Sequence, residues 1–104
     1  MSVISVYVVF ANAEEAERIG RVMVEEGLAA CINILAPIRS IYRWQGAIES
    51  ADEVAAIFKT STAKVDALIA RIAAMHSYEV PCIAAWPIDR ILGAYAQWVE
   101  DSTA

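Results

Sequence analysis

The chain has 104 residues, of which 59% are hydrophobic and 20% charged, and its net charge is −5. Eight basic residues against thirteen acidic ones cannot supply the phosphate neutralisation that nucleic acid or an anionic membrane requires, so we expect neither partner. The length fits a single domain over residues 1–104. Because so small a domain has little interior, the high apolar share predicts association with other copies of the chain.

Residues 3–10 carry apolar side chains on both faces of an extended strand, which is typical of a central strand covered twice. Asn12 is a favourable helix N-cap, and Glu15 three residues later completes a capping-box pattern. Gly27 suits the C-terminal end of that helix. The first helix is therefore predicted over residues 13–26.

A long hairpin is predicted next, with strands over 30–44 and 47–60 joined by a turn at Gln45-Gly46. Pro37 cannot donate to a ladder, so it marks a bulge, a bend or an edge. The polar residues 50–53 are expected to interrupt the returning strand. The hairpin is longer than a compact sheet of this size needs, which favours a projecting arm.

A second helix is predicted from a cap at Ser61 or Thr62, with apolar residues at helical spacing from Val65 to Met75. It must end near residues 76–78, because Pro81 disfavours helix in the residue before it. A last strand over 80–88 and a short C-terminal helix follow. The order βαββαβ predicts an α+β, ferredoxin-like sandwich with both main helices on one face.

The stretch HSYEVPC, residues 76–82, holds the single histidine of the chain. A transition-metal site needs three or four ligands, and one chain offers His76 with Glu79 or Cys82 nearby. A histidine at a helix C-terminus also has a structural role, which we favour, although a threefold oligomer would bring several copies together. Glu79, a polar residue before a buried strand, is open to either role.

The two cysteines, Cys31 and Cys82, are predicted to be small buried hydrophobic residues with free thiols, as in a cytosolic protein. Residues 1–13 lack a basic residue ahead of the apolar run, so export is not expected. No Gly-rich phosphate loop, H-E-x-x-H, paired C-x-x-C or G-x-S-x-G motif occurs, and we expect no enzyme.

Five segments of the sequence form a recognisable pattern: LAACINI (28–34), SIYRWQG (40–46), FKT (58–60), HSYEVP (76–81) and YAQW (95–98). Taken together, in this order and at similar spacing, they resemble the CutA divalent-cation tolerance proteins. The resemblance implies a ferredoxin-like fold, a tight homotrimer built through the hairpin arms, and a cytoplasmic location. It also implies a role in divalent-metal tolerance with copper binding, and no enzymatic activity.

This sequence departs from the family pattern where metal is concerned. Phe10 and Met75 stand where metal-binding members can carry a cysteine and a second histidine, and Cys82 replaces a usually acidic residue. A thioether or a thiol is a soft donor suited to Cu(I). The predicted ligands of copper or another divalent cation are His76, Cys82, Cys31 and Met75, and no cofactor is required. The predicted ligand cleft contains Tyr78, Glu79, Trp44 and Asn33.

The favoured interpretation is a trimeric CutA-like protein of divalent-metal tolerance that binds metal weakly between subunits. The alternative is a trimeric ferredoxin-like signalling module that binds a small metabolite or a partner protein in the same cleft, using Trp44. A small enzyme with Glu79 and His76 as base and acid is a third, less favoured hypothesis. Loss of His76 separates the first two, because it should abolish metal binding without necessarily abolishing metabolite binding.

Overall fold

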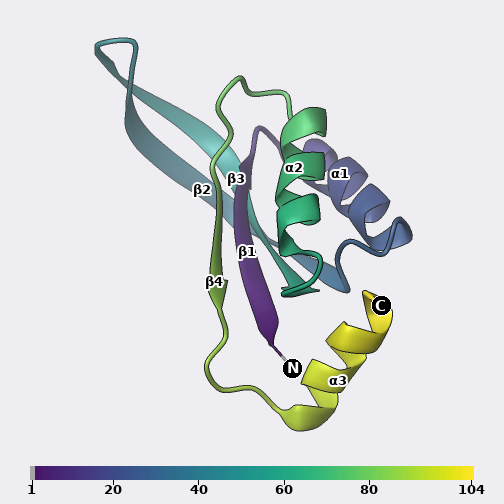
Figure 1. Ribbon diagram of the computed structural model, residues 1–104. Coiled ribbons are helices and arrows are strands. Elements are labelled where there is room, and N and C mark those ends of the chain that lie inside the picture. Colours follow the sequence, from purple (N-terminus) through teal and green to yellow (C-terminus); the bar gives the residue numbers. More distant parts are fainter. Residues whose placement is uncertain (1) are drawn as a thin grey trace.

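The computed structural model describes residues 2–104, and this part of the chain forms one antiparallel sheet with strand order β2-β3-β1-β4. Helices α1 and α2 cover one face of the sheet, as Figure 1 shows. The α+β class and the ferredoxin-like order predicted from the sequence are confirmed. The elements are β1 (Val3–Phe10), α1 (Ala13–Glu25), β2 (Cys31–Trp44), β3 (Ala47–Ser61), α2 (Val65–Met75), β4 (Ile83–Pro87) and α3 (Gly93–Ser102).

Strand β1 lies at the centre of the core. Its helix-facing residues Val6, Val8 and Phe10 are fully buried and pack in one cluster with residues of α1, α2 and β3. Val3 and Val9, on the opposite face, are 2% and 8% exposed, so the predicted burial of both faces is confirmed. Helix α3 adds a second cluster at the Val3 end of β1. None of the helices within residues 2–104 is long and apolar enough to cross a membrane.

Helix α1 begins as its sequence predicts. The side chain of Asn12 accepts a hydrogen bond from the Glu15 N–H at 2.8 Å, which satisfies one free donor of the first turn. The Glu15 carboxylate turns back and accepts from the N–H of Ala11 at 3.1 Å, one residue before the expected capping-box partner. The helix ends at Glu25, and just beyond its C-cap Gly27 has a φ of +71°, which suits glycine.

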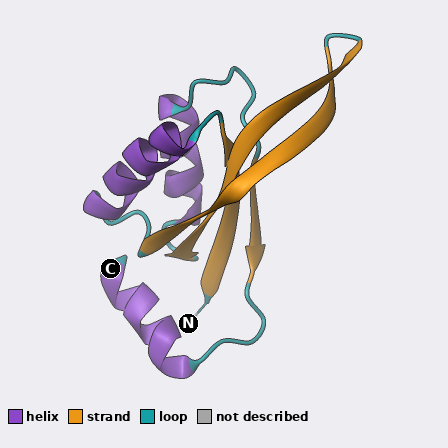
Figure 2. Ribbon diagram, turned by 180° about the vertical axis from the view of Figure 1, so that it is seen from behind, coloured by secondary structure: helices purple, strands orange, loops and turns teal. Residues whose placement is uncertain are grey.

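Strands β2 and β3 form the predicted arm, which extends beyond both helices in Figures 1 and 2 and gives the molecule a longest dimension of 45 Å. Its turn at Gln45 and Gly46 has positive φ at both residues, the backbone that a two-residue hairpin loop requires. The register shifts between Ile34 and Pro37, so the irregularity predicted at Pro37 is confirmed.

The prediction that residues 50–53 interrupt the returning strand is wrong. Strand β3 is continuous, because a β-ladder depends on backbone pairing and its polar side chains find other partners, such as Tyr78 for the buried Glu53. Arg39 on β2 pairs with Asp52 on β3, and their side chains form an ion pair at 3.0 Å.

Two other boundaries differ from the predictions. Neither Ser61 nor Thr62 caps α2, whose N-cap is Lys64 without a side-chain hydrogen bond. Ser61 instead ends β3 and accepts from the Thr103 hydroxyl at 3.0 Å, which ties α3 to the sheet. Strand β4 begins at Ile83, later than predicted, because residues 79–82 run as a loop along the sheet.

Candidate functional site

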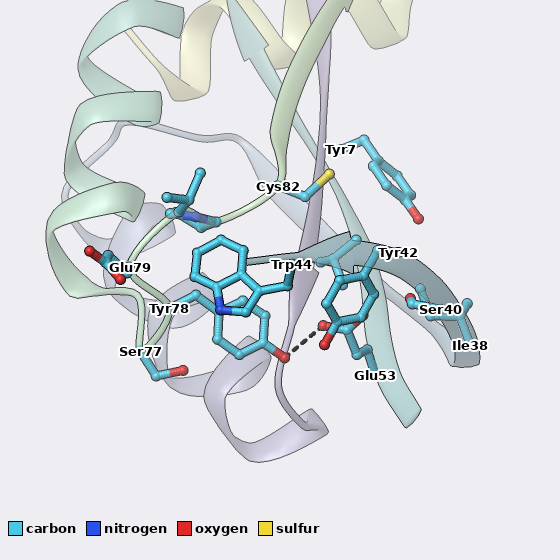
Figure 3. A pocket seen from close by; sticks show the side chains of 13 residues that line it. Tyr7, Ile38, Ser40, Tyr42, Trp44, Glu53, Ser77, Tyr78, Glu79 and Cys82 are labelled. Carbon is cyan, nitrogen blue, oxygen red and sulfur yellow. Dashed lines mark hydrogen bonds between the residues drawn. The ribbon is translucent and has the colours of Figure 1, made fainter. Parts of the chain in front are cut away.

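A cleft of about 780 Å³ lies on the sheet face away from α1 and α2, between the arm and the segment 77–82. Successive side chains of a strand point to opposite faces, so Tyr7 and Val9 face this side while Val8 faces the helices. The cleft and its side chains are seen in Figure 3. It is lined by Tyr7, Val9, Ile38, Ser40, Tyr42, Trp44, Glu53, Ser77, Tyr78, Glu79, Val80, Pro81 and Cys82.

A short hydrogen bond joins the two walls of the cleft. The Tyr78 hydroxyl donates to Oε2 of Glu53 at 2.6 Å (Figure 3), and Glu53 is only 7% exposed. Burial raises the pKa of the Tyr78 phenol well above its ordinary value, and the Glu53 carboxylate raises it further. Tyr78 therefore remains a neutral donor at physiological pH and holds the Glu53 carboxylate in place.

His76 is fully buried and uses both ring nitrogens within the chain. Nδ1 accepts from the Tyr78 N–H at 3.0 Å, and Nε2 lies 2.8 Å from the carbonyl oxygen of Val9. Because a carbonyl only accepts, Nε2 carries the proton and the imidazole is neutral. The ring stacks on Phe10, with centroids 5.3 Å apart. His76 thus fastens the segment 77–82 to β1, and a metal at Nδ1 would have to displace the Tyr78 N–H.

Glu15 lies beneath this junction, and the sequence did not reveal its second role. Its Oε2 accepts from the Ser77 N–H at 3.0 Å, and its Oε1 lies 3.9 Å from Nε2 of His76. Burial raises the pKa of Glu15, but the hydrogen bonds that its carboxylate accepts from Ser77 and Ala11 outweigh this effect, so the pKa falls below its ordinary value. The capping pattern explained Glu15 through its own helix and gave no signal of Ser77.

The four predicted metal ligands do not lie together. Cys82 lines the cleft and is exposed, so its predicted burial is wrong for the single chain. Met75 packs against the main core. Among residues 2–104 no three His, Cys, Asp or Glu side chains form a group that could hold a metal ion.

Cys31 lies at the other end of the sheet, where its sulfur is 3.4 Å from the Tyr95 hydroxyl. Through β3 it aligns with Ser5 of β1, whereas the carbonyl of Cys82 accepts from the N–H of Val9. Four residues of strand correspond to about 13 Å, and two further strands separate the thiols. One chain therefore cannot bring both thiols to one ion.

Three of the four predicted cleft residues line the cleft: Tyr78, Glu79 and Trp44. Asn33 pairs with Ile57 nearer the start of β2 and is not among the lining residues. Tyr7, Tyr42 and Glu53 also line the cleft, although they were not predicted as cleft residues. The hairpin register carried a usable signal for Glu53, because pairing it with Ile38 places both on the same face as Tyr42.

A four-stranded antiparallel sheet in this order, with two helices on one face and a projecting hairpin, defines a ferredoxin-like α+β protein. Residues 4–102 match the family model described as CutA1 divalent ion tolerance protein, and the chain belongs to this family. The resemblance drawn from the sequence is thereby confirmed.

Individual relatives agree with this assignment. The chain is 43% identical over 97 residues to a divalent-cation tolerance protein CutA of Archaeoglobus fulgidus, covering 93% of this chain and 94% of the relative. It is 39% identical over 102 residues to protein CutA of Homo sapiens, covering 98% of this chain and 57% of the human one. A solved structure titled as the periplasmic divalent cation tolerance protein CutA from Archaeoglobus fulgidus matches with a TM-score of 0.94 at 41% identity, covering 98% of this chain and 99% of that one.

Proposed function

We propose that this chain acts in tolerance to divalent cations, as a non-catalytic cytoplasmic homotrimer that binds a cation, such as copper, weakly between subunits. Membership of the CutA1 family carries the proposal. The trimer is supported by large apolar side chains that the single chain leaves in solvent, above all Ile41 and Ile48 on the arm, 74% and 64% exposed.

The proposed cation contact is the Cys82 thiol, and the Glu79 carboxylate, which also lines the cleft, is a further oxygen donor. Both side chains are exposed and line the cleft, whereas the other three predicted ligands are engaged elsewhere. A thiolate is a good ligand for Cu(I) and Zn²⁺, but one chain supplies fewer than the three or four ligands such ions prefer. A neighbouring subunit would have to complete the set, which is consistent with weak binding.

Calorimetric titration of reduced, tag-free protein with Zn²⁺ and with Cu(I), under anaerobic conditions, tests this proposal. We expect saturable binding that weakens at least tenfold in Cys82→Ser and is unchanged in the matched control Cys31→Ser. Equal binding by Cys82→Ser and the wild type, or no saturable binding by the wild type, would contradict it.

A second candidate function is that of a trimeric ferredoxin-like signalling module that binds a small metabolite or a partner protein in the same cleft. The observation in its favour is the cleft itself, whose volume of about 780 Å³ falls in the range of small-molecule sites and far exceeds the needs of one ion. Removal of metal with EDTA separates the two functions, because metabolite binding would survive it.

A further inference from the structure

The cleft has a one-sided charge. Its described lining contains two carboxylates, Glu53 and Glu79, and no lysine, arginine or histidine. Arg39 lies on the arm between the cleft residues Ile38 and Ser40. Because successive side chains of a strand point to opposite faces, Arg39 points away from the cleft, where it forms an ion pair with Asp52. An anionic ligand would meet repulsion in this cleft, and a cationic one would meet attraction.

The Glu53 carboxylate is buried and held in position, unlike a charged side chain on the open surface. It is more than nine-tenths buried, and one of its oxygens already accepts from Tyr78 at 2.6 Å. Within residues 2–104 every fully buried side-chain oxygen has a hydrogen-bond partner. Oε1 of Glu53 has none, so this oxygen is not fully buried and reaches the space of the cleft that Glu53 lines. A carboxylate fixed in this way gains most from an N–H donor that also carries a positive charge.

Aromatic rings surround this carboxylate. Figure 3 shows Tyr42, Trp44 and Tyr78 gathered about Glu53, with Tyr7 on the adjacent wall. In the single chain Tyr42 and Trp44 are 41% and 38% exposed, so this chain presents their faces to the cleft. Aromatic faces attract cations and also pack against apolar groups. The ring of Tyr78 is itself held by His76, whose centroid lies 4.8 Å away.

From the buried carboxylate, the aromatic walls and the absence of basic groups among the described residues that this chain contributes to the cleft, we infer that the cleft binds a small organic cation. Its ammonium group pairs with Glu53, and its aromatic or aliphatic body packs against Tyr42 and Trp44. This inference rests on the second candidate function and names its ligand class. It does not depend on the metal site at Cys82, because an organic amine brings its own charge and requires no inner-sphere ligands.

The test compares three probes of equal shape and different charge: phenethylamine, 2-phenylethanol and phenylacetate. Full-length protein in its native assembly is titrated with each in the presence of EDTA, by calorimetry or by tryptophan fluorescence. We expect phenethylamine to bind saturably and at least tenfold more tightly than the neutral alcohol, and phenylacetate to bind most weakly. Equal binding of the three probes, or no binding of phenethylamine, would overturn the inference.

Substitutions locate the binding. Glu53→Gln, which keeps the shape and removes the charge, should weaken phenethylamine binding at least tenfold, while Glu25→Gln on the exposed surface of α1 should leave it unchanged. If Glu53→Gln does not fold, Trp44→Ala takes its place, with Trp98→Ala as the control, because both tryptophans are exposed and only Trp44 lines the cleft. Unchanged affinity in the folded cleft variant overturns the inference.

The two proposals fail separately. Zinc binding lost in Cys82→Ser, together with no phenethylamine binding, would support the metal site and refute the organic cation. Phenethylamine binding in EDTA, together with no metal binding, would do the reverse.

Discussion

At the scale of single residues, His76 joins three parts of the molecule through one imidazole. It accepts from Tyr78, donates to Val9 and stacks on Phe10, and its side chain is completely buried. Removal of such a ring loses two hydrogen bonds, leaves a cavity and releases the backbone of the segment that lines the cleft.

We predict that His76→Ala lowers the free energy of unfolding by about 3 kcal/mol, from the combined loss of buried hydrogen bonds and packing. Urea denaturation measures the change, with the exposed Asp89→Ala as a control expected to stay within about 0.5 kcal/mol of the wild type. A His76→Ala protein as stable as the wild type would refute the structural role.

Glu15 provides a prediction about pH. Its pKa in the folded chain lies below the ordinary value, so the unfolded chain binds the proton more readily. Its contribution to stability is therefore complete above the ordinary pKa of about 4.3 and is lost as pH falls through the folded pKa. The stability difference between wild type and Glu15→Gln, measured by denaturation, should be largest near pH 7 and shrink below about pH 4. A difference independent of pH would contradict this role.

The predictability of each contact followed its distance along the chain. Asn12 and Glu15 are three residues apart, and spacing alone predicted their bond. The bond between Glu15 and Ser77 spans 62 residues, and that between Tyr78 and Glu53 spans 25. Such contacts depend on how the sheet brings segments together, which local patterns do not encode, and they are the contacts that build the cleft.

At the scale of elements, α1 packs closely on β2 because Gly20 has no side chain. A Cβ at that position would lie 2.6 Å from Cδ1 and 2.9 Å from Cγ2 of Ile32. Alanine would favour the helix by about 1 kcal/mol, but the overlap with a β-branched side chain costs about 1–3 kcal/mol. Glycine at position 20 lowers helix propensity, but it allows α1 to lie close to β2.

We predict that Gly20→Ala lowers the free energy of unfolding by about 1 kcal/mol, because the overlap outweighs the gain in helix propensity. Thermal and urea denaturation measure it, and the added change Ile32→Val should recover part of the loss by removing Cδ1. Gly93→Ala, at the start of α3 with no atom near its Cβ position, is the matched control and should not destabilise. A Gly20→Ala protein more stable than the wild type would contradict this prediction, because it would mean that the Ile32 side chain moves aside without loss of stability.

Periodicity predicted the helices and strands that the structure describes in residues 2–104, but it misjudged the continuity of β3, the start of α2 and the start of β4. Polar residues 50–53 suggested a break in β3, yet the ladder with β2 continues through them because its bonds are made by the backbone. Pattern also extended β4 back over residues 80–82, where Pro81 and the bonds of the His76 junction favour a loop.

At the scale of the whole molecule, the arm leaves large apolar side chains in water, which a stable monomer rarely does. We predict a mass in light scattering of about three times the 11.3 kDa chain. The double change Ile41→Glu and Ile48→Glu should reduce that mass, because a buried carboxylate opposes association. Val24→Glu, at an exposed position of α1, should leave the mass unchanged. A wild-type monomer would refute the assembly.

Anomalous diffraction at the zinc edge, from crystals of the reduced protein grown with Zn²⁺, tests the central claim most directly. We expect a peak about 2.3 Å from the sulfur of Cys82. We also expect a ligand from a neighbouring subunit of a threefold assembly, and a His76 ring still bonded to Tyr78 and Val9. A peak on Nδ1 of His76 with the Tyr78 N–H displaced, or no peak in the cleft, would contradict it.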